Sequence, residues 1–490
     1  MDGRGVGFDV GTPSVIRSTI SGSDSTTRLD ILLGGIVAIG IALRFSCSLD
    51  DHDSCLFVAA VERFNIAEHR PHPPGYPIYI LAAKMLTGLF ATPESALAFL
   101  SVVSAGLAAM LLPRLFRRMG ASDAVSYVQA FVVVVTPCFW LTGSKVLTDM
   151  PGFAATLMLW IAHLREHDPP SRKIAFWLGV ATGLACGVRA HVFLPMIPFL
   201  LRGPVLLRLA GAALGFGIWY GGMALHQGVE AIVAATEKQA MMRFHEPNVS
   251  VFVGDGVWRR AVRFAKGFME GSLGLAPWRT TLWVVAGCVL AYTLKWIAGI
   301  TSKGESLRSL IRTPRGMIFA AAACQCVFVF LFLPAHPRYF LAALPAVAVA
   351  MTFDRIAFGV VLTVVIGGFT FERARLLHEV PPAPFQAVQW MNRVDPEGST
   401  PLLAGKMFAY AREAAPDRVA SRGSWDPKVL PPPIAFFTDR ATIPDDLPGY
   451  RVSESSTFER DEAVHDKDFS IRIRRFEPVS TDAVIEAPPR

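Results

Sequence analysis

The sequence predicts a mainly α-helical protein that crosses a membrane many times and carries a small α/β domain at its carboxyl end. Apolar residues make up 52% of the 490 residues, and charged residues only 18%. A soluble domain carries about 25% charged residues, so most of this chain is expected to lie in lipid or in a buried core. The apolar character ends near Phe371. We therefore expect a disordered cytoplasmic tail over 1–28, a transmembrane domain over 29–371 and an outer α/β domain over 372–490.

About eleven apolar stretches are candidates for membrane spans, although several are shorter than the roughly 20 residues that a straight crossing helix needs. They are 31–48, 96–113, 124–142, 149–164, 174–188, 190–201, 204–226, 280–298, 316–333, 338–353 and 356–371. A further stretch, 76–90, is ambiguous because it is apolar but short. It either crosses or lies on the outer surface.

Basic residues decide between these two topologies. If the amino end is cytoplasmic and 76–90 does not cross, four successive basic loops face the cytoplasm, as the positive-inside rule requires. Their basic residues are Arg114, Arg117 and Arg118, then Arg165, Arg172 and Lys173, then Arg202 and Arg208, and finally Lys295, Lys303, Arg308, Arg312 and Arg315. If 76–90 crossed, all four loops would face outward. We therefore expect the non-crossing topology.

Two segments outside the spans have recognisable patterns. GVWRRAVRFAKGFME, within the outer loop 228–275, predicts a basic amphipathic helix that either lies on the membrane surface or packs on the bundle. In the tail, PPAPFQAVQWMNRV and KMFAYAREAA favour helices, whereas PPIAFFTD and DFSIRIRRFEP favour strands. No basic run is interleaved with aromatic residues in a soluble module, so a nucleic-acid partner is not expected.

A cluster of carboxylates follows the first span directly. The segment LDDHDSCLF carries Asp50, Asp51, His52 and Asp53. Placing a charged carboxylate beside hydrocarbon costs free energy, so carboxylates at this position suggest a functional role. A partly shielded carboxylate also has a raised pKa and is a better general base. The alternative for each of the three Asp residues is a solvated charge at a helix end.

Further charged residues occur at the ends of other spans, and the non-crossing topology places all of them on the outer side. They are Arg70 and His72 in RPHPPGYP, Asp149 in VLTDMPGF, Arg189 and His191 in LACGVRAHVFLP, and His336, Arg338 and Tyr339 in LPAHPRYFLAALP. Structural alternatives are a rigid loop cap at the prolines, a helix-dipole charge at Asp149 and a snorkelling Arg338. Acids and cations that converge on one membrane face are nevertheless suited to binding a phosphorylated lipid.

Several of these segments resemble the polytopic glycosyltransferases of the GT-C fold, in particular the dolichyl-phosphate-mannose protein mannosyltransferase-like group (glycosyltransferase family 39-like) and its bacterial relatives. The resemblance covers about residues 30–355 in order. The matching pieces are DSCLFVAAVERF, HPPGYPIYIL, VLTDMPGFAATLML, GLACGVRAHVFLP and HPRYFLAALPAV. It implies a catalytic Asp at Asp53, with Asp51 as the second choice, and a second acidic position at Asp149. The frequent Asp-Glu pair of the family is absent, since Ser54 follows Asp53.

The resemblance implies an inverting transfer of a sugar, such as the hexose mannose, from a polyprenyl-phosphate donor to an acceptor hydroxyl of a protein, lipid or glycan. His72, Arg189, Arg338 and Tyr339 are expected to hold the donor phosphate, and His336 and His245 to lie on the acceptor side or at an interface. No cofactor or metal is required, although the Asp-rich run could bind a divalent ion. We expect a multi-pass protein of the bacterial inner membrane, with its site facing the periplasm or the exterior.

Two other classes of function remain open at this point. A transporter or flippase of a lipid-linked or anionic solute would also place Arg and His in the membrane, but it predicts inverted repeats and interrupted helices near the midplane. A receptor or scaffold without chemistry is the third possibility. The sequence contains no evident internal repeat, and its ionisable residues are expected at span ends, which favours the enzyme.

Overall fold

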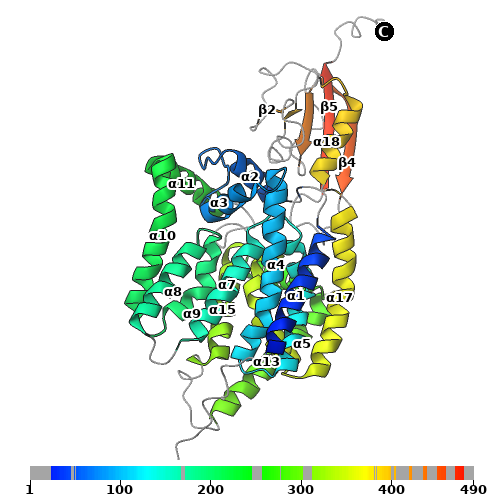
Figure 1. Cartoon of the computed structure of the whole chain (residues 1–490). Coiled ribbons are helices and arrows are strands. Elements are labelled where there is room, and N and C mark those ends of the chain that lie inside the picture. Colours follow the sequence, from blue (N-terminus) through cyan, green and yellow to red (C-terminus); the bar gives the residue numbers. More distant parts are fainter. Residues whose placement is uncertain are drawn as a thin grey trace, which may run out of the picture.

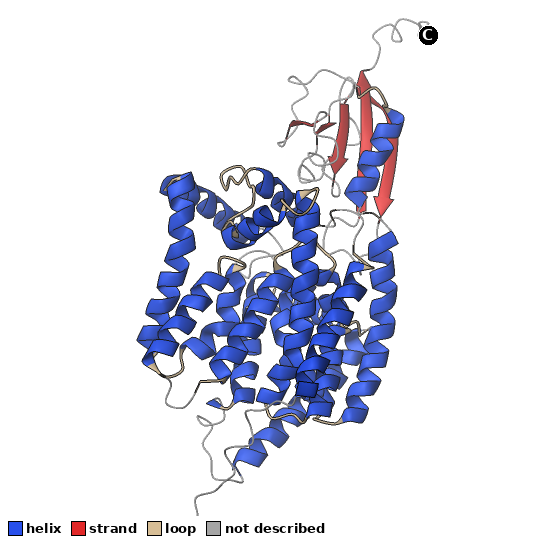
Figure 2. Cartoon of the chain, in the orientation of Figure 1, coloured by secondary structure: helices blue, strands red, loops and turns tan. Residues whose placement is uncertain are grey.

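The chain forms a helical bundle with a small mixed sheet beyond one of its ends (Figures 1 and 2). A computed structural model describes the bundle and the regular elements of the tail. The described residues are 24–45, 49, 51–166, 171–245, 256–275, 278–301, 312–379, 381, 383–398, 402–403, 419–421, 434–438, 450–459 and 470–478.

Five helices of the described part are long and apolar enough to cross a membrane. They are α1 (Asp24–Ala42), α4 (Pro93–Arg118), α10 (Val205–Gln227), α15 (Pro314–Phe332) and α17 (Ile356–Glu379). A sixth is added if α5 (Asp123–Val134) and α6 (Pro137–Gly143), which meet at a bend of 66°, form one broken span. These helices and the composition make the chain an integral, multi-pass membrane protein.

The other predicted spans correspond to helices that do not combine the length and the apolar composition of a span. They are α7 (Asp149–Leu164), α8 (Arg172–Ala185), η2 (Ala190–Val192) with α9 (Phe193–Leu200), α13 (Trp278–Thr301), and η4 (Pro337–Ala343) with α16 (Leu344–Thr352). The mainly α-helical polytopic fold is therefore confirmed. The count of about eleven crossings stays a prediction, because these helices do not meet the length and composition that a straight span needs.

Three short helices cover one end of the bundle, which we call the capped end. They are α2 (His52–Glu62), α3 (Pro77–Leu86) and α11 (Val229–His245), and Figure 1 shows them above the vertical helices, on the same side as the tail. Helix α3 has 10 residues, which span only about 15 Å at 1.5 Å per residue. It is too short to cross, as the charge pattern predicted for 76–90.

Many helix starts follow local sequence signals. Thr92, Thr136 and Thr313 each cap a helix by accepting a hydrogen bond from a backbone N–H, and each is followed directly by a proline. A proline at the first helical position loses no hydrogen bond there, and its fixed φ suits the helix. These signals are local, so they can be seen in the sequence.

The first helix begins earlier than predicted. Residues 24–28, expected in the disordered tail, form the first turn of α1. Asp30 is buried and accepts hydrogen bonds from Arg114, Arg117 and Tyr127, and the Tyr127 hydroxyl also donates to the carbonyl of Thr26. These long-range contacts hold the polar first turn on the bundle, and a local pattern cannot reveal them.

The basic segment of the outer loop is a helix, α12 (Val257–Lys266), that packs on the bundle. Arg260 is buried and donates to the carbonyls of Phe330 and Leu331 at the end of α15. The ring of Phe264 contacts that of Phe340, at 5.0 Å between centroids. Packing on the bundle, one of the two alternatives, is thus what the structure shows. A π-helix, η3 (Gly267–Ser272), follows directly.

The tail contains α18 (Ala383–Val394) and a five-stranded sheet. The strands are β1 (Leu402–Leu403), β2 (Val419–Ser421), β3 (Ile434–Thr438), β4 (Tyr450–Glu459) and β5 (Ser470–Pro478), in the order β2-β1-β3-β5-β4. Strand β1 pairs in parallel with β2 and β3, and β5 pairs antiparallel with β3 and β4. One predicted helix and both predicted strands are confirmed. KMFAYAREAA lies outside the described residues. Helix α17 continues to Glu379, so the α/β part begins after the predicted boundary at 372.

Candidate active site

Two carboxylates at the start of α2 share one guanidinium. Asp51 caps the helix by accepting a hydrogen bond from the backbone N–H of Asp53, at 3.0 Å. Its other oxygen accepts from Nη1 of Arg338 at 3.2 Å, while Nη2 of Arg338 donates to Asp53 at 2.8 Å. Arg338 belongs to η4, which is far away in the sequence. The side chains of Arg338 and Asp51 are 5% and 4% exposed and that of Asp53 is 15% exposed, so Asp53 is the more accessible acid.

The Pro-rich turn brings a third group to Asp53. Nδ1 of His72 lies 3.8 Å from an oxygen of Asp53, and Nε2 of His72 lies 2.9 Å from the hydroxyl of Tyr76. Tyr76 adopts the left-handed backbone conformation, with φ 49°, directly before α3. Such a conformation is uncommon for a residue with a side chain and is held only by well-packed surroundings. It directs the phenol back toward His72.

Tyr76 is a neutral hydrogen-bonding group in this site. Burial raises the pKa of its phenol far above the usual range, against the lowering effect of the nearby Arg189. The ring of Phe57, on α2, contacts both Tyr76 and His72, at 5.3 and 6.0 Å between centroids. The turn is therefore fixed to the helix that carries Asp53.

A second buried ion pair joins Asp149 and Arg189. Nη2 of Arg189 lies 2.7 Å from Asp149, and Nη1 donates to the hydroxyl of Thr148 at 2.8 Å. The close approach depends on Gly152, one turn along α7. A Cβ there would lie 2.8 Å from Cδ of Arg189.

The ring of Tyr339 lies between the two arginines. The guanidinium carbons of Arg189 and Arg338 are 5.1 and 5.4 Å from its centroid, within cation–π range. His191 contacts the same ring at 5.0 Å and His336 at 6.1 Å. The ring of Tyr339 thus contacts both cations and two histidines.

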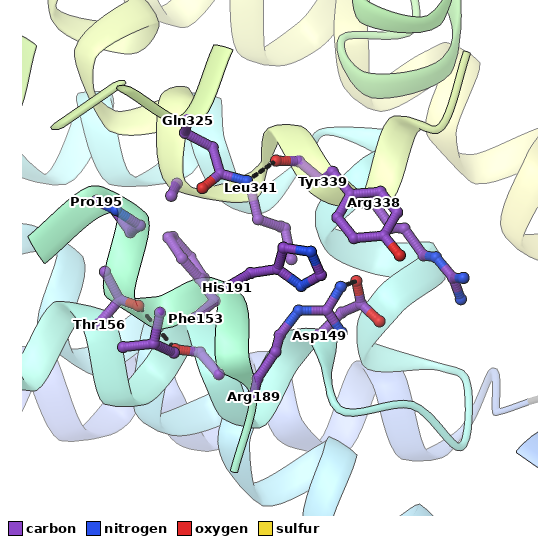
Figure 3. A pocket seen from close by; sticks show the side chains of 13 residues that line it. Asp149, Phe153, Thr156, Arg189, His191, Pro195, Gln325, Arg338, Tyr339 and Leu341 are labelled. Carbon is purple, nitrogen blue, oxygen red and sulfur yellow. Dashed lines mark hydrogen bonds and ion pairs between the residues drawn. The ribbon is translucent and has the colours of Figure 1, made fainter. Parts of the chain in front are cut away.

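A small cavity of about 30 Å³ lies beside these arginines. Asp149, Arg189, His191, Arg338 and Tyr339 are among the residues that line it. Figure 3 shows Arg189 and Asp149 facing each other on one side, and Gln325 reaching the backbone of Tyr339 on another. That volume is about the share of a single water molecule.

The structure places most of the predicted site residues in one region. Asp51, Asp53, His72, Asp149, Arg189, Arg338, Tyr339 and His336 all belong to this network or touch it. Asp50 lies outside the described residues. His245 is the last residue of α11, and its side chain is not among those described. The catalytic and binding roles assigned to these residues stay predictions.

The sequence reasoning missed three polar residues of the site. Thr148 and Gln325 contact Arg189 and the Tyr339 carbonyl, and Tyr76 contacts His72. Gln325 could have been noticed as an amide in the middle of an apolar helix. Tyr76 lies inside HPPGYP, but nothing local indicates its left-handed backbone.

A divalent ion at the Asp-rich run would depend on how the possible metal ligands are arranged. Among the described residues, no group of three or more His, Cys, Asp or Glu side chains is arranged to hold a metal ion. Whether a divalent ion takes part in the reaction stays a prediction.

Comparison with known proteins gives structural neighbours only. No family model matches the chain, and no curated protein matches it. The crystal structure of ArnT from Cupriavidus metallidurans bound to undecaprenyl phosphate is similar with a TM-score of 0.49 and 11% identity, over 95% of this chain and 99% of that chain. For ArnT in the apo state the TM-score is 0.47 and the identity 13%, over 92% and 98% of the two chains. Likeness at this level assigns neither an activity nor a substrate.

Proposed function

We propose that the chain is a membrane glycosyltransferase that moves a sugar from a polyprenyl-phosphate donor to an acceptor hydroxyl at the capped end. The observation that carries this proposal is the Asp51–Arg338–Asp53 triad next to the Asp149–Arg189 pair. Buried charges are costly, and removing one partner leaves the other unpaired. Such an arrangement, on the border of a membrane bundle, suits a substrate that brings its own charge.

Arg338 and Arg189 would hold the donor phosphate. A guanidinium binds a phosphate through two parallel hydrogen bonds, and it stabilises the negative charge that develops as the glycosidic bond breaks. The two cations face the same ring of Tyr339, so one phosphate could contact both. His72 would add a hydrogen bond from the other side of Asp53.

Asp53 would act as the general base. Three acids, Asp51, Asp53 and Asp149, share two arginines, so phosphate binding must displace a carboxylate from a guanidinium. Asp51 is held by its capping bond to α2 and is the more buried acid, which makes Asp53 the one that is released. A released and partly shielded Asp53 can accept the acceptor proton as the hydroxyl attacks, giving inversion. Asp149 would orient the acceptor.

The sugar is proposed to be a hexose such as mannose, and the acceptor a protein, a lipid or a glycan. The capped end is proposed to face the periplasm of a bacterial inner membrane. No cofactor is part of the proposal. The tail lies beyond the capped end (Figure 1), where it could cover an acceptor.

Transport is the second class of function and has less support. Other buried or half-buried ion pairs of the described bundle lie near helix ends, as in Asp30–Arg114, Glu166–Arg208 and Asp354–Arg315. A transport pathway would instead place such groups near the midplane of the membrane.

The direct test uses purified protein in nanodiscs with a labelled polyprenyl-phosphate sugar and a mixed acceptor fraction. Transfer, or slow hydrolysis, with release of free polyprenyl phosphate supports the enzyme. Binding of the donor without any bond cleavage, under conditions in which acceptors are present, would reject it. Mass spectrometry of glycans and lipids from cells with and without the chain would then identify the sugar and the acceptor.

A further inference from the structure

A second cavity, distinct from the candidate active site, lies between α10, α11 and the Pro-rich turn. Its volume is about 240 Å³, below the roughly 300–1,000 Å³ of a pocket for a drug-sized ligand. The lining is mostly apolar, and its polar members are Tyr220 on α10 and Thr236 and Glu237 on α11. Even Trp219 offers only its ring, because its indole N–H donates to the carbonyl of Gly183. The cavity therefore suits a segment of hydrocarbon chain.

The membrane can reach this cavity. Helix α10 is one of the five helices that qualify as spans, and in Figure 1 it stands at the edge of the bundle. Its outward side chains are exposed and apolar, with Ile218 at 55% and Leu225 at 92%. Phe216, which lines the cavity, is itself 44% exposed. A chain of a neighbouring lipid can enter beside it without leaving an apolar environment.

The cavity also lies directly against the Pro-rich turn. Pro73 and Pro74 line it directly, next to His72. Gly75, with φ 97°, lies so close to two other lining residues that a Cβ would be 2.8 Å from both Ile66 and Met223. A ligand in the cavity therefore presses on the turn that holds His72 near Asp53.

A second contact ties the segment that precedes this turn to the same helix. The side-chain amide of Gln227, at the end of α10, donates to the carbonyl of Phe64 at 2.8 Å and accepts from the N–H of Ile66 at 3.0 Å. The segment that contains Phe64 and Ile66, which borders the cavity, is thus held by the last residue of α10. A movement of α10 relative to α11 would therefore displace the Pro-rich turn.

The charge of Glu237 limits which lipid head groups can lie at the cavity. Among the described residues that line the cavity, only Glu237 is charged, so an anionic head group without a compensating cation would be repelled there. A phospholipid with an ammonium group can place that group near Glu237 and its acyl chain in the cavity. A polyprenyl phosphate offers only an anion near Glu237.

We propose that the acyl chain of an amine-headed phospholipid, such as phosphatidylethanolamine, occupies this cavity and supports the turn that carries His72. Binding of the lipid is independent of the catalytic proposal. Only the consequence for Asp53 and His72 rests on the proposed function.

Native mass spectrometry of the delipidated protein, titrated with phosphatidylethanolamine, tests the binding. We expect one tightly retained lipid in the wild type. Met223→Phe and Ile232→Phe fill the cavity and should lose this lipid. Leu225→Phe changes an exposed residue of the same helix and should keep it. The proposed lipid site is contradicted if both filled variants retain the lipid, or if the wild type retains no lipid.

Two further measurements identify the head group of the bound lipid and test its effect on the Pro-rich turn. Glu237→Gln, an exposed substitution that should fold, is expected to remove the preference for phosphatidylethanolamine over phosphatidylglycerol, an anionic phospholipid that has no ammonium group. Hydrogen exchange of peptides that cover 64–76 should slow when the lipid is added to the wild type, and should not respond in Met223→Phe. Polyprenyl phosphate retained in place of the phospholipid, and lost in the same filled variants, would overturn the choice of ligand. An unchanged head-group preference in Glu237→Gln would overturn the role of Glu237.

Discussion

Arg338 is the residue on which the electrostatics of the candidate site depend. It is almost fully buried and holds two carboxylates that come from another part of the sequence. The sequence allowed a prediction that Asp53 and Arg338 lie on one membrane face, because both follow or begin apolar spans. It did not indicate that Asp51 shares the same guanidinium, since this depends on how α2 is oriented by its cap. Residues at span ends could be predicted, but their pairing could not.

Replacing Arg338 should therefore cost stability as well as function. Arg338→Gln leaves two buried acids without their cation, and removing one partner of a buried ion pair costs about 3–5 kcal/mol. Unfolding of the purified protein in one detergent measures this. Arg375→Gln is the matched control, because Arg375 forms exposed pairs with Glu372 and Glu379, which are worth about 0–1 kcal/mol. Equal effects of the two substitutions would contradict a central role for Arg338.

Gly152 is expected to set the position of Arg189. In Gly152→Ala the new methyl group would collide with Arg189, because the built Cβ lies 2.8 and 2.9 Å from two of its side-chain carbons. Arg189 should then separate from Asp149, and donor binding should weaken while the fold is retained. Equilibrium binding of a labelled polyprenyl-phosphate sugar is the measurement. Gly88→Ala, where nothing lies within 4 Å of the Cβ, should bind as the wild type does. Unaltered binding in Gly152→Ala would show that this pair does not hold the donor.

At the scale of elements, α8 and α10 make the closest backbone approach in the described bundle for which glycine is required. A Cβ at Gly183 would lie 2.1 Å from the carbonyl oxygen of Ala212, and one at Gly215 would lie 2.1 Å from that of Val180. Small residues at such spacing let membrane helices pack closely. The glycines recur in the sequence at four-residue intervals, so the close packing of α8 and α10 could have been predicted from the sequence. The contacts of α1 with α4 and α5 were not, because they depend on the buried Asp30.

This packing predicts a contrast between glycines of one helix. Gly215→Ala should push α10 away from α8 and lower the free energy of unfolding by about 1–3 kcal/mol, as overpacking does. Gly217→Ala, two residues away, meets nothing within 4 Å. It should be neutral or stabilising, by up to about 1 kcal/mol, because alanine favours the helix. Thermal unfolding of both variants checks the contrast. A loss of similar size in Gly217→Ala would mean that helix propensity, and not packing, governs this helix.

At the scale of the whole molecule, the capped end gathers the candidate site, the lipid cavity and the tail on one side of the bundle (Figure 1). The basic loops that were used to predict the topology belong to the other end, where α4 ends and α15 begins. Hydropathy and charge could thus predict the sidedness of the site. They could not predict which spans are interrupted, because breaks such as the 66° bend between α5 and α6 depend on packing around a proline.

The sidedness can be measured in intact cells. We expect an impermeant maleimide to label Glu68→Cys, in the loop of the capped end, after the outer membrane is permeabilised. Arg118→Cys, at the end of α4, should be labelled only after the inner membrane is broken. The reverse pattern would place the site on the cytoplasmic side and contradict the positive-inside prediction.

The central claim is that Asp53 removes a proton from the acceptor as the donor phosphate leaves. The most direct measurement is transfer from a labelled polyprenyl-phosphate sugar by Asp53→Asn in membranes. General-base catalysis contributes about 10²–10⁴-fold, so we expect the rate to fall by that factor. Glu62→Gln, at the other end of α2, should transfer at the wild-type rate. Undiminished transfer by Asp53→Asn would reject Asp53 as the base, and undiminished transfer by Asp51→Asn as well would reject the carboxylate pair.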